Sequence, residues 1–523
     1  MNMKNDVDNT QQTLNNLCRE ALDISELDNT EDLFVYGLDS ISIINIVAKI
    51  NKEFNIEMSV NDIIENCTIN QIANFILTSG NMSKQVNVHY DLIEPDNVNI
   101  HNKFPLTPIQ SAYIMGRNTE FEMGGNGTHF YLELKTKYSP SNISKNLNEI
   151  IALIPALRTV FSDNYQQILE RVPIYEIKTE EVVSNQVANR IKELRNEMSH
   201  QVFDPKTWPL FDFRILKIRK NEYYLFVSID LLIADAASII KWGNLLADMC
   251  SGGKYNLKEL DISTRDYILA CQRMKHTELY ENDYNYWMNK IADFPESPNL
   301  PYCKNTRDII KPHYSRFEYR MAPERWNILK SKFQKKKITP SAALCTIYAE
   351  LMAKWSDQEK VAINLTAFNR FPVHPEVEEL FGDFTTVIPL DYCSNKENDF
   401  WKAASVTQSK IYNALEHRHY DGVEFTQELA KYRKYEFGKA VMPIVFSSML
   451  FENGNFGWSE LGDIQYAISQ TPQVFIDYQV MEDKGALCIT WDYVNELFDK
   501  NIIKKMFEQY VVAVNNLLDE KCS

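Results

Sequence analysis

Apolar and polar positions follow a helical spacing through the first eighty residues of the chain. One helix is expected from about Thr13 to Leu22, and a second begins near Ser40 with apolar residues three and four positions apart. Ser59 and Thr68 are placed to cap two shorter helices, the last of which ends near residue 80. The pattern predicts a small domain of four helices.

The spacing of apolar residues changes after this helical domain, to which we assign residues 1–80. Residues 81–103 are polar, contain Pro95 and keep no regular period, which is typical of an interdomain linker. Strand-like and helical stretches then alternate, so we expect residues 104–520 to form a mixed α/β domain. Examples are the strand-like residues 224–230 and 360–365 and the helical residues 341–355.

Charge and cysteine content narrow the possible partners and the compartment. A formal net charge of −16 at pH 7 argues against nucleic acid or an anionic membrane surface as a partner. The nine cysteines are scattered, without a CxxC pair or a cluster with histidine, which indicates reduced thiols and no metal site. The first ten residues lack the apolar core of a signal peptide, and no apolar run is long enough to span a membrane. We expect a cytoplasmic protein.

The motif Gly37-Leu38-Asp39-Ser40 stands at the start of the second expected helix. Asp39 can cap that helix, which places the serine hydroxyl where free backbone N–H groups and the helix dipole favour an attached phosphate. The first eighty residues also hold 13 acidic residues against 4 Lys or Arg. The motif and its acidic, helical context resemble the acyl, aryl and peptidyl carrier domains, whose serine carries 4′-phosphopantetheine. The residues Gly37-Leu38-Asp39-Ser40 favour aryl and acyl carriers over peptidyl carriers. The alternative is that Asp39 and Ser40 only cap a helix.

A series of motifs follows in the large domain in a recognisable order. The set resembles the heterocyclization branch of the nonribosomal peptide synthetase condensation superfamily, over essentially all of residues 104–515. In order, the motifs are Phe104–Arg117; the D-x-x-x-x-D-x-x-S core of Asp230, Asp235 and Ser238; Gly382–Thr385; Pro443–Ser448; Ser469–Asp477; Gly485; and Trp491-Asp492. The resemblance implies two chloramphenicol-acetyltransferase-like lobes around a tunnel, approximately residues 104–290 and 291–520, with carrier arms entering from opposite faces.

Ordinary condensation domains carry an H-H-x-x-x-D-G motif. In this chain Asp230 and Leu231 stand at the positions of the two histidines. An imidazole base at this strand is therefore not expected. Asp230 and Asp235 can act as paired carboxylates in acid–base chemistry. The other interpretation is structural, because a buried carboxylate needs a partner. By analogy with condensation domains we nominate Arg370 as the partner of Asp235, with Ser238 as part of the same core.

Two later motifs bear on ring formation. The resemblance implies that Asp477 and Ser447 are the catalytic pair for cyclodehydration, within a sequence context that includes Gln473. The family usually has threonine where this chain has Ser447, so the hydroxyl is kept and the methyl group that restricts its rotamer is lost. The structural alternatives are that Ser447 closes a strand hydrogen bond and that Asp477 caps a turn.

Four further polar residues have both a functional and a structural interpretation. Tyr113 and Arg117, in the opening motif, either line the tunnel or pack within the fold. His417 and His419 suggest a metal or acid–base site, but no third ligand is evident in the sequence, and local polar structure is the simpler interpretation.

The resemblance implies a two-stage reaction. An acyl group on the Ser40 arm is condensed with Cys, Ser or Thr on a downstream carrier, and the amide then closes to a thiazoline or oxazoline with loss of water. The expected partners are a phosphopantetheinyl transferase, a stand-alone or adjacent adenylation enzyme and the downstream carrier, and an aryl acid such as salicylate or 2,3-dihydroxybenzoate, as in siderophore pathways, fits as donor. Two rivals remain open: a domain that condenses without cyclising, and a non-catalytic module that only docks carriers.

Overall fold

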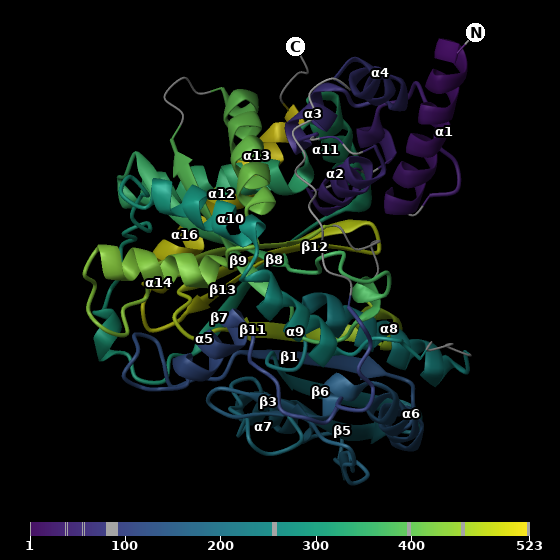
Figure 1. Ribbon diagram of the computed structural model, residues 1–523. Coiled ribbons are helices and arrows are strands. Elements are labelled where there is room, and N and C mark those ends of the chain that lie inside the picture. The colour runs from purple at the N-terminus through teal and green to yellow at the C-terminus, as the bar shows by residue number, and fades with distance from the viewer. Residues whose placement is uncertain are drawn as a thin grey trace.

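The computed structural model describes residues 2–22, 24–36, 38, 40–54, 56, 58–79, 93–253, 259–394, 399–450 and 456–519. Asp39, the expected helix cap, and residues 81–92 of the expected linker lie outside these ranges, as does the side chain of Ser40. The rest of the expected linker runs without helix or strand along the large domain, where Arg265 lies 3.1 Å from the carboxylate of Asp96. The helical domain packs beside the large domain near α13 (Phe400–Glu416), which contacts α3 (Val60–Glu65) (Figure 1).

The helical domain follows the apolar pattern closely. Its elements are α1 (Asn2–Leu22), a 3₁₀ turn (Leu33–Tyr36), α2 (Ser40–Phe54), α3 (Val60–Glu65) and α4 (Ile69–Ser79). Ser59 caps α3 in a capping box with Asp62, as its position predicts. Helix α1 begins well before the expected Thr13, because residues 7–13 are helical without burying any side chain and so carry no apolar period.

The first sheet of the large domain has five strands in the order β11-β1-β6-β5-β4. Helix α8 (Ala236–Ser251) packs with α6 (Pro140–Leu153) in a core that takes every second side chain of β6, whereas α7 (Val187–Met198) contacts β6 from the other face. The strands are β11 (Asp463–Gln470), β1 (His129–Thr136), β6 (Glu222–Asp230), β5 (Phe211–Arg219) and β4 (Lys178–Glu181). A separate pair, β2 (Thr159–Phe161) and β3 (Gln166–Ile168), lies beside it.

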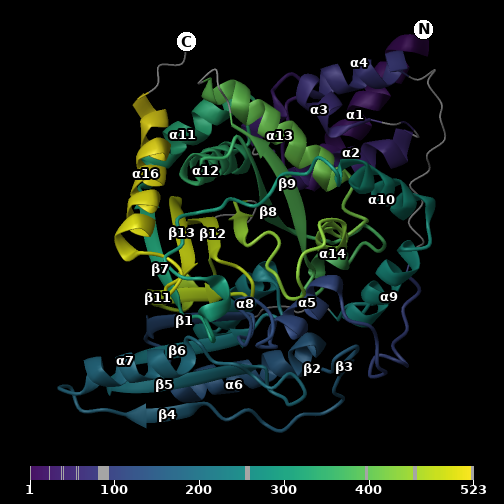
Figure 2. The same cartoon turned by 90° about the vertical axis from the view of Figure 1, so that its left-hand side faces the viewer.

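The second sheet has six strands in the order β7-β13-β12-β10-β8-β9. Its strands are β7 (Tyr314–Met321), β13 (Ala486–Val494), β12 (Ile476–Asp483), β10 (Ile444–Met449), β8 (Lys360–Phe368) and β9 (Thr385–Cys393). Helices pack on one side of it, and the first sheet lies on the other side (Figure 2). These helices are α11 (Pro323–Lys335), α12 (Pro340–Ser356), α13 (Phe400–Glu416) and α16 (Lys500–Asp519).

Strand β11 crosses between the two halves of the large domain. It lies far along the chain, within the expected second lobe, yet it pairs antiparallel with β1 of the first sheet. The short helix α15 (Trp458–Leu461) before it packs on α8, where Trp458 donates its indole N–H to the carbonyl of Ile239 at 3.0 Å. The two sheets therefore do not correspond to two uninterrupted stretches of sequence.

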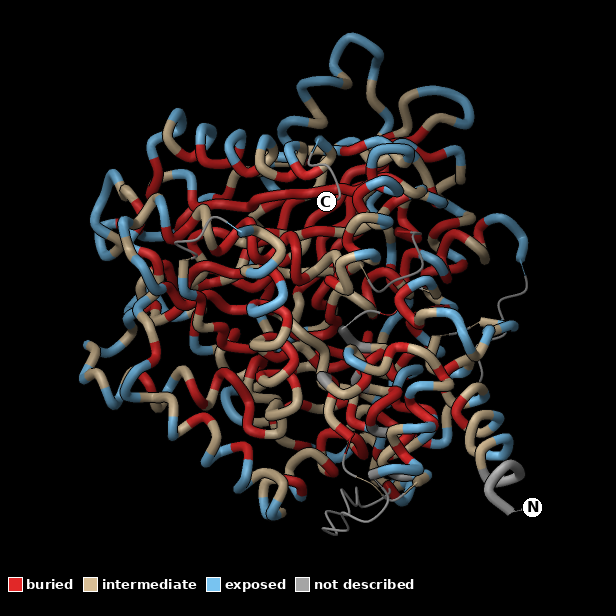
Figure 3. The backbone as a smooth tube through the Cα atoms, turned by 90° about the horizontal axis from the view of Figure 1, so that it is seen from above, coloured by how far each residue is buried: buried red, intermediate tan, exposed pale blue. Residues whose placement is uncertain are grey.

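Alternation along the strands of the second sheet separates an apolar face from a polar one. On β12, Ile476, Tyr478 and Val480 are buried in the core shared with α12 and α16. Asp477 and Gln479 therefore point to the opposite face, which is the face turned toward the first sheet. Buried segments run through the interior of both halves (Figure 3). The remaining helices, α5 (Pro108–Gly116), α9 (Thr264–Met274), α10 (Glu278–Lys290) and α14 (Gly422–Tyr432), connect and flank the sheets.

Candidate functional site

Asp477 and Ser447 meet on the polar face of the second sheet. Strands β10 and β12 are parallel neighbours in which Val445 pairs with Asp477 and Ser447 with Gln479. This register puts both side chains on one face, and the Ser447 hydroxyl donates to Asp477 Oδ1 at 3.1 Å. Asp477 therefore lies within a strand and does not cap a turn. The Ser447 side chain bonds the carboxyl group and not a strand carbonyl.

Among the described residues, the hydrogen-bond partners of the Asp477 carboxyl group are neutral. Besides Ser447, the amide Nε2 of Gln479 donates to Asp477 Oδ2 at 2.6 Å. Burial raises the pKa of Asp477 from its ordinary value to about 7, and the nearby charge of Asp492 adds to this rise. The group can therefore exist as an acid and as a carboxylate near neutral pH, which is what proton transfer in both directions requires.

An arginine–aspartate pair lies next to this carboxyl group. Arg316 on β7 donates from Nε and Nη2 to the two oxygens of Asp492 on β13, at 2.6 and 2.5 Å. Asp492 is fully buried and also accepts the backbone N–H of Ser469 at 2.8 Å. Sequence reasoning missed Arg316 and Gln479. Gln479 was within reach, because it follows Asp477 by two positions in a strand and so shares its face, but nothing in the sequence pointed to Arg316.

Asp235 joins the two halves of the large domain. It caps α8 by accepting the backbone N–H of Ser238 at 2.8 Å, and Arg370 Nη2 lies 3.0 Å from its Oδ2. The same oxygen accepts the backbone N–H of Phe384 at 3.3 Å. The Ser238 hydroxyl bonds both the carbonyl and the N–H of Gly382. Asp235 and Ser238 thus tie α8 of the first half to the segment that leads into β9.

Asp230 is paired with another residue of the opening motif. Arg117 donates to Asp230 Oδ2 at 2.5 Å and to the carbonyl of Phe203 at 2.7 Å. Burial raises the pKa of Asp230, while the Arg117 charge opposes that rise. Asp230 and Arg117 are therefore brought together as an ion pair, and the paired-carboxylate arrangement of Asp230 with Asp235 is not what their contacts show. Across the strands, Asp230 pairs with His129, which is fully buried.

Tyr113 lies between these groups. Its side chain is buried, and the pKa of its hydroxyl is raised by burial and by the carboxylates of Asp383, Asp477, Asp235 and Asp230, in that order. The phenol therefore stays protonated. Asp383, part of the Gly382–Thr385 motif, is also buried, and burial together with the Asp235 charge raises its pKa well above the ordinary value.

Gln473 lies in the loop between β11 and β12 and stabilises the conformation of that loop. It has a positive φ of 63°, which is uncommon for a residue with a side chain. Its side-chain Nε2 donates to the carbonyl of Gly438 at 3.0 Å, and Tyr314 donates to the carbonyl of Thr471 at 2.7 Å. No contact links Gln473 to Asp477 among the described hydrogen bonds, so its place is in the support of the loop.

The histidines before α14 take part in local packing. His419 Nδ1 lies 2.8 Å from Asp283 Oδ2, and its ring stacks on Phe371. The ring of His417 stacks on Tyr286 with centroids 3.7 Å apart. Within the described part of the chain, no three His, Cys, Asp or Glu side chains are grouped to hold a metal ion. None of the helices described is both long and apolar enough to cross a membrane.

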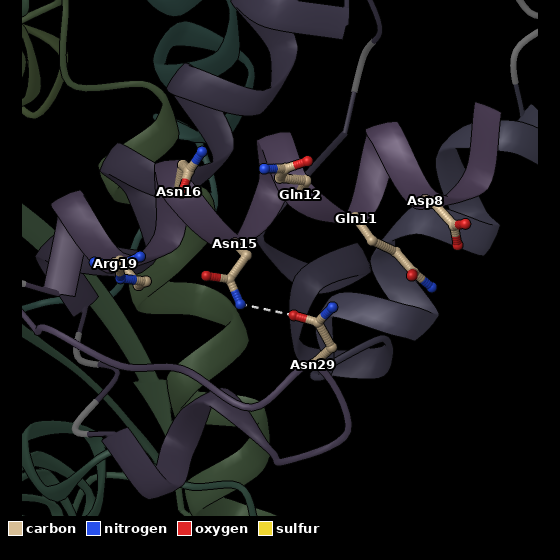
Figure 4. A pocket seen from close by; sticks show the side chains of 7 residues that line it. All are labelled: Asp8, Gln11, Gln12, Asn15, Asn16, Arg19 and Asn29. Atoms are coloured by element: carbon tan, nitrogen blue, oxygen red, sulfur yellow. Dashed lines mark hydrogen bonds between the residues drawn. The ribbon is translucent and has the colours of Figure 1, made fainter. Parts of the chain in front are cut away.

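A polar hollow on α1 is separate from this site. It is lined by amide and charged side chains, and Asn15 donates to Asn29 Oδ1 at 2.7 Å across it (Figure 4). The lining residues are Asp8, Gln11, Gln12, Asn15, Asn16, Arg19 and Asn29. The hollow holds no nucleophile or paired acid, so it offers no catalytic arrangement.

Comparison with known proteins gives consistent matches. A condensation-domain family model matches residues 100–522, and a phosphopantetheine attachment site model matches residues 12–76. Bacitracin synthase 1 of Bacillus licheniformis is 34% identical over 97% of this chain, which spans 10% of that protein. Phenyloxazoline synthase MbtB of Mycobacterium sp. is 26% identical over 97% of this chain, which spans 43% of it. The EpoB cyclization-docking bidomain of Sorangium cellulosum superposes with a TM-score of 0.79 at 27% identity, over 86% of this chain and 93% of the bidomain.

Proposed function

This chain belongs to the condensation-domain family, and we propose that it joins two carrier-bound substrates through an amide and then closes that amide to a thiazoline or oxazoline ring. The observation that carries the proposal is the Asp477 carboxyl group, which is bonded by Ser447 and Gln479 and has a pKa raised to about 7. Relatives described as a phenyloxazoline synthase and as a cyclization bidomain support ring formation.

Ring closure needs a group that both gives and takes a proton. The thiol or hydroxyl of the joined Cys, Ser or Thr attacks the amide carbonyl, and the carbonyl oxygen takes up the proton of the attacking group. The resulting hydroxyl leaves as water when Asp477 donates its proton to it. The amide nitrogen then loses its hydrogen to the Asp477 carboxylate as the C=N bond forms, so the acid is restored and one water is lost.

Other residues of the site hold this carboxyl group and its surroundings. The Ser447 hydroxyl orients Oδ1, and Tyr113 stays protonated among the neighbouring carboxylates. Asp235 with Arg370 holds the two halves together, and Asp230 with Arg117 fixes the opening motif. In this scheme Asp230 and Asp235 are structural and do not exchange protons with the substrate.

The helical domain fits the attachment of 4′-phosphopantetheine. Ser40 is the first residue of α2, at the end of the helix where the helix dipole favours a phosphate. When attached at Ser40, the arm supplies a thiol that carries the acyl group as a thioester. We propose as partners a phosphopantetheinyl transferase, a stand-alone or adjacent adenylation enzyme and a downstream carrier charged with Cys, Ser or Thr. An aryl acid such as salicylate or 2,3-dihydroxybenzoate is the proposed donor.

The experiment follows the mass of the acceptor carrier. Ser40 is loaded with a salicyl- or dihydroxybenzoyl-phosphopantetheine arm, and a carrier charged with cysteine or threonine is added. Intact-protein mass spectrometry should show acyl transfer and then loss of one water. Asp477→Ala should stop at the amide, and Ser40→Ala should show no transfer.

Three outcomes separate the proposal from its rivals. Transfer without loss of water in the unaltered protein would make this a condensation domain whose ring closure occurs elsewhere. Binding of loaded carriers without transfer would make it a docking module. Failure to load Ser40 would overturn the assignment of the carrier.

A further inference from the structure

The orientation of the Gln479 amide group decides how the Asp477 carboxyl group is held. Gln479 lies two residues beyond Asp477 on β12, and its Nε2 donates to Asp477 Oδ2 at 2.6 Å. A glutamine side chain can present either its N–H₂ group or its carbonyl oxygen to a neighbour. The amide alone therefore does not determine whether it donates to Asp477 or meets it with a lone pair.

Arg316 removes that ambiguity. Its Nη2 donates to Gln479 Oε1 at 3.2 Å, and its guanidinium group is held by two hydrogen bonds to Asp492. Because a guanidinium group has donors only, the carbonyl oxygen of Gln479 must face it. The N–H₂ group is then left facing Asp477. A chain of hydrogen bonds thus runs from a fixed ion pair to the carboxyl group.

This chain determines which oxygen of Asp477 carries the acidic proton. Oδ2 faces the N–H₂ group of Gln479, which can only donate, whereas the Ser447 hydroxyl, 3.1 Å from Oδ1, donates to the carboxylate but can rotate and accept from the acid. A proton bound to the carboxyl group therefore belongs on Oδ1. We propose that Gln479, oriented by Arg316, is a positioning residue that presents the acidic proton of Asp477 at Oδ1. The inference rests on the proposed ring closure, because it assigns the side of the carboxyl group from which that reaction takes its proton.

The charges around Asp477 are consistent with this arrangement. Asp492 and Arg316 face it from β13 and β7, and the protonated phenols of Tyr314 and Tyr113 lie near it on β7 and α5. Removing the donor of Gln479 takes away a bond that stabilises the carboxylate form, so the pKa of Asp477 should rise further.

Two variants test the proposal in the full chain. Gln479→Met keeps the length of the side chain and removes both hydrogen bonds. Arg316→Lys keeps a positive charge for Asp492 but loses the second N–H that orients the amide. Each should lower the rate of ring closure about tenfold and move the alkaline limb of its pH profile up by about one unit, with amide formation unchanged. Gln186→Met, at an exposed position next to α7, is the matched control and should change neither.

A second measurement decides the proposal without any activity. The free energy of unfolding is measured against pH for each protein and for the same protein with Asp477→Asn, and the difference reports the titration of Asp477. Gln479→Met should shift that titration to higher pH. If Asp477 titrates at the same pH in Gln479→Met as in the unaltered protein, or if ring closure slows without a shift of its pH profile, Gln479 only supports the fold. If the unaltered protein forms the amide and never loses water, the proposed function fails, while the titration still decides the role of Gln479.

Discussion

Two aspartates of the large domain, Asp235 and Asp477, show how the same side chain serves different ends. Asp235 is fully buried, caps α8 and lies 3.0 Å from the guanidinium group of Arg370. Asp477 is partly buried in a strand and is held by the neutral donors of Ser447 and Gln479. The first carboxylate has a counter-charge and holds structure together. The second is hydrogen-bonded to neutral donors among the residues that the structure describes, and its pKa is raised to about 7.

The two residues show that the position of a carboxyl group in the interior does not by itself decide what the group does. Both carboxyl groups belong to motifs and both face the region between the two sheets. What differs is the charge of the contacting group, because a cation stabilises the carboxylate whereas burial with neutral donors leaves it easy to protonate.

Asp235→Ala should lower the free energy of unfolding by about 3–5 kcal/mol, because it leaves the buried charge of Arg370 without its carboxylate and removes the cap of α8. Amide formation and ring closure should fall together as the two halves loosen. Urea unfolding measures the change, and Asp163→Ala, which breaks an exposed pair with Lys206, should cost less than about 0.5 kcal/mol. A stable but inactive Asp235→Ala protein would instead place Asp235 in the chemistry.

Asp477→Asn should slow ring closure by about 10²–10⁴-fold, because the amide that replaces the carboxyl group cannot deliver a proton. Amide formation should persist, and the free energy of unfolding at pH 7 should not fall. Single-turnover mass spectrometry separates the two steps. Equal loss of both steps would assign Asp477 to condensation or to the fold.

The pH dependence of stability should differ between the unaltered protein and Asp477→Asn. The pKa of Asp477 is raised to about 7 in the folded state from an ordinary value of 3.8, so the folded state binds the proton more tightly. Its contribution to stability is therefore present at low pH and lost as the pH rises from about 4 to 7. Asp477→Asn should gain about 2–4 kcal/mol relative to the unaltered protein between pH 4 and pH 8. Parallel curves in denaturant titrations would show that this pKa is not raised.

Ser447→Ala should slow ring closure about tenfold and shift its alkaline limb upward, because it removes a hydrogen bond that favours the carboxylate form. Ser447→Thr keeps the hydroxyl and should stay within about threefold of the unaltered rate. Rates of water loss across pH 5–9 would decide this. A threonine variant as slow as the alanine variant would mean that the hydroxyl is not what Ser447 contributes.

Local patterns predicted much of the fold. The apolar period located α2 and α4, the cap at Ser59 predicted the start of α3, and the strand-like residues 224–230 fall within β6. These features depend on neighbours a few positions away, so the sequence displays them directly. The first half of α1 was not predicted, because it is helical without an apolar stripe. The pairing of β11 with the first sheet was not predicted either, because pairing between distant strands leaves no local pattern in the sequence.

Ordered motifs and helix signals are read along the chain, and they were enough to predict the order of the two domains, the serine at the start of α2 and the candidate residues Asp477 and Ser447. The partners of these residues depend on the tertiary structure. The register of β10 against β12 brings Ser447 to Asp477, and the pairing of β13 with β7 brings Arg316 to Asp492 and Gln479. The protonation of a carboxyl group depends on burial and on charges within a few ångströms, and those neighbours come from strands far apart in the sequence.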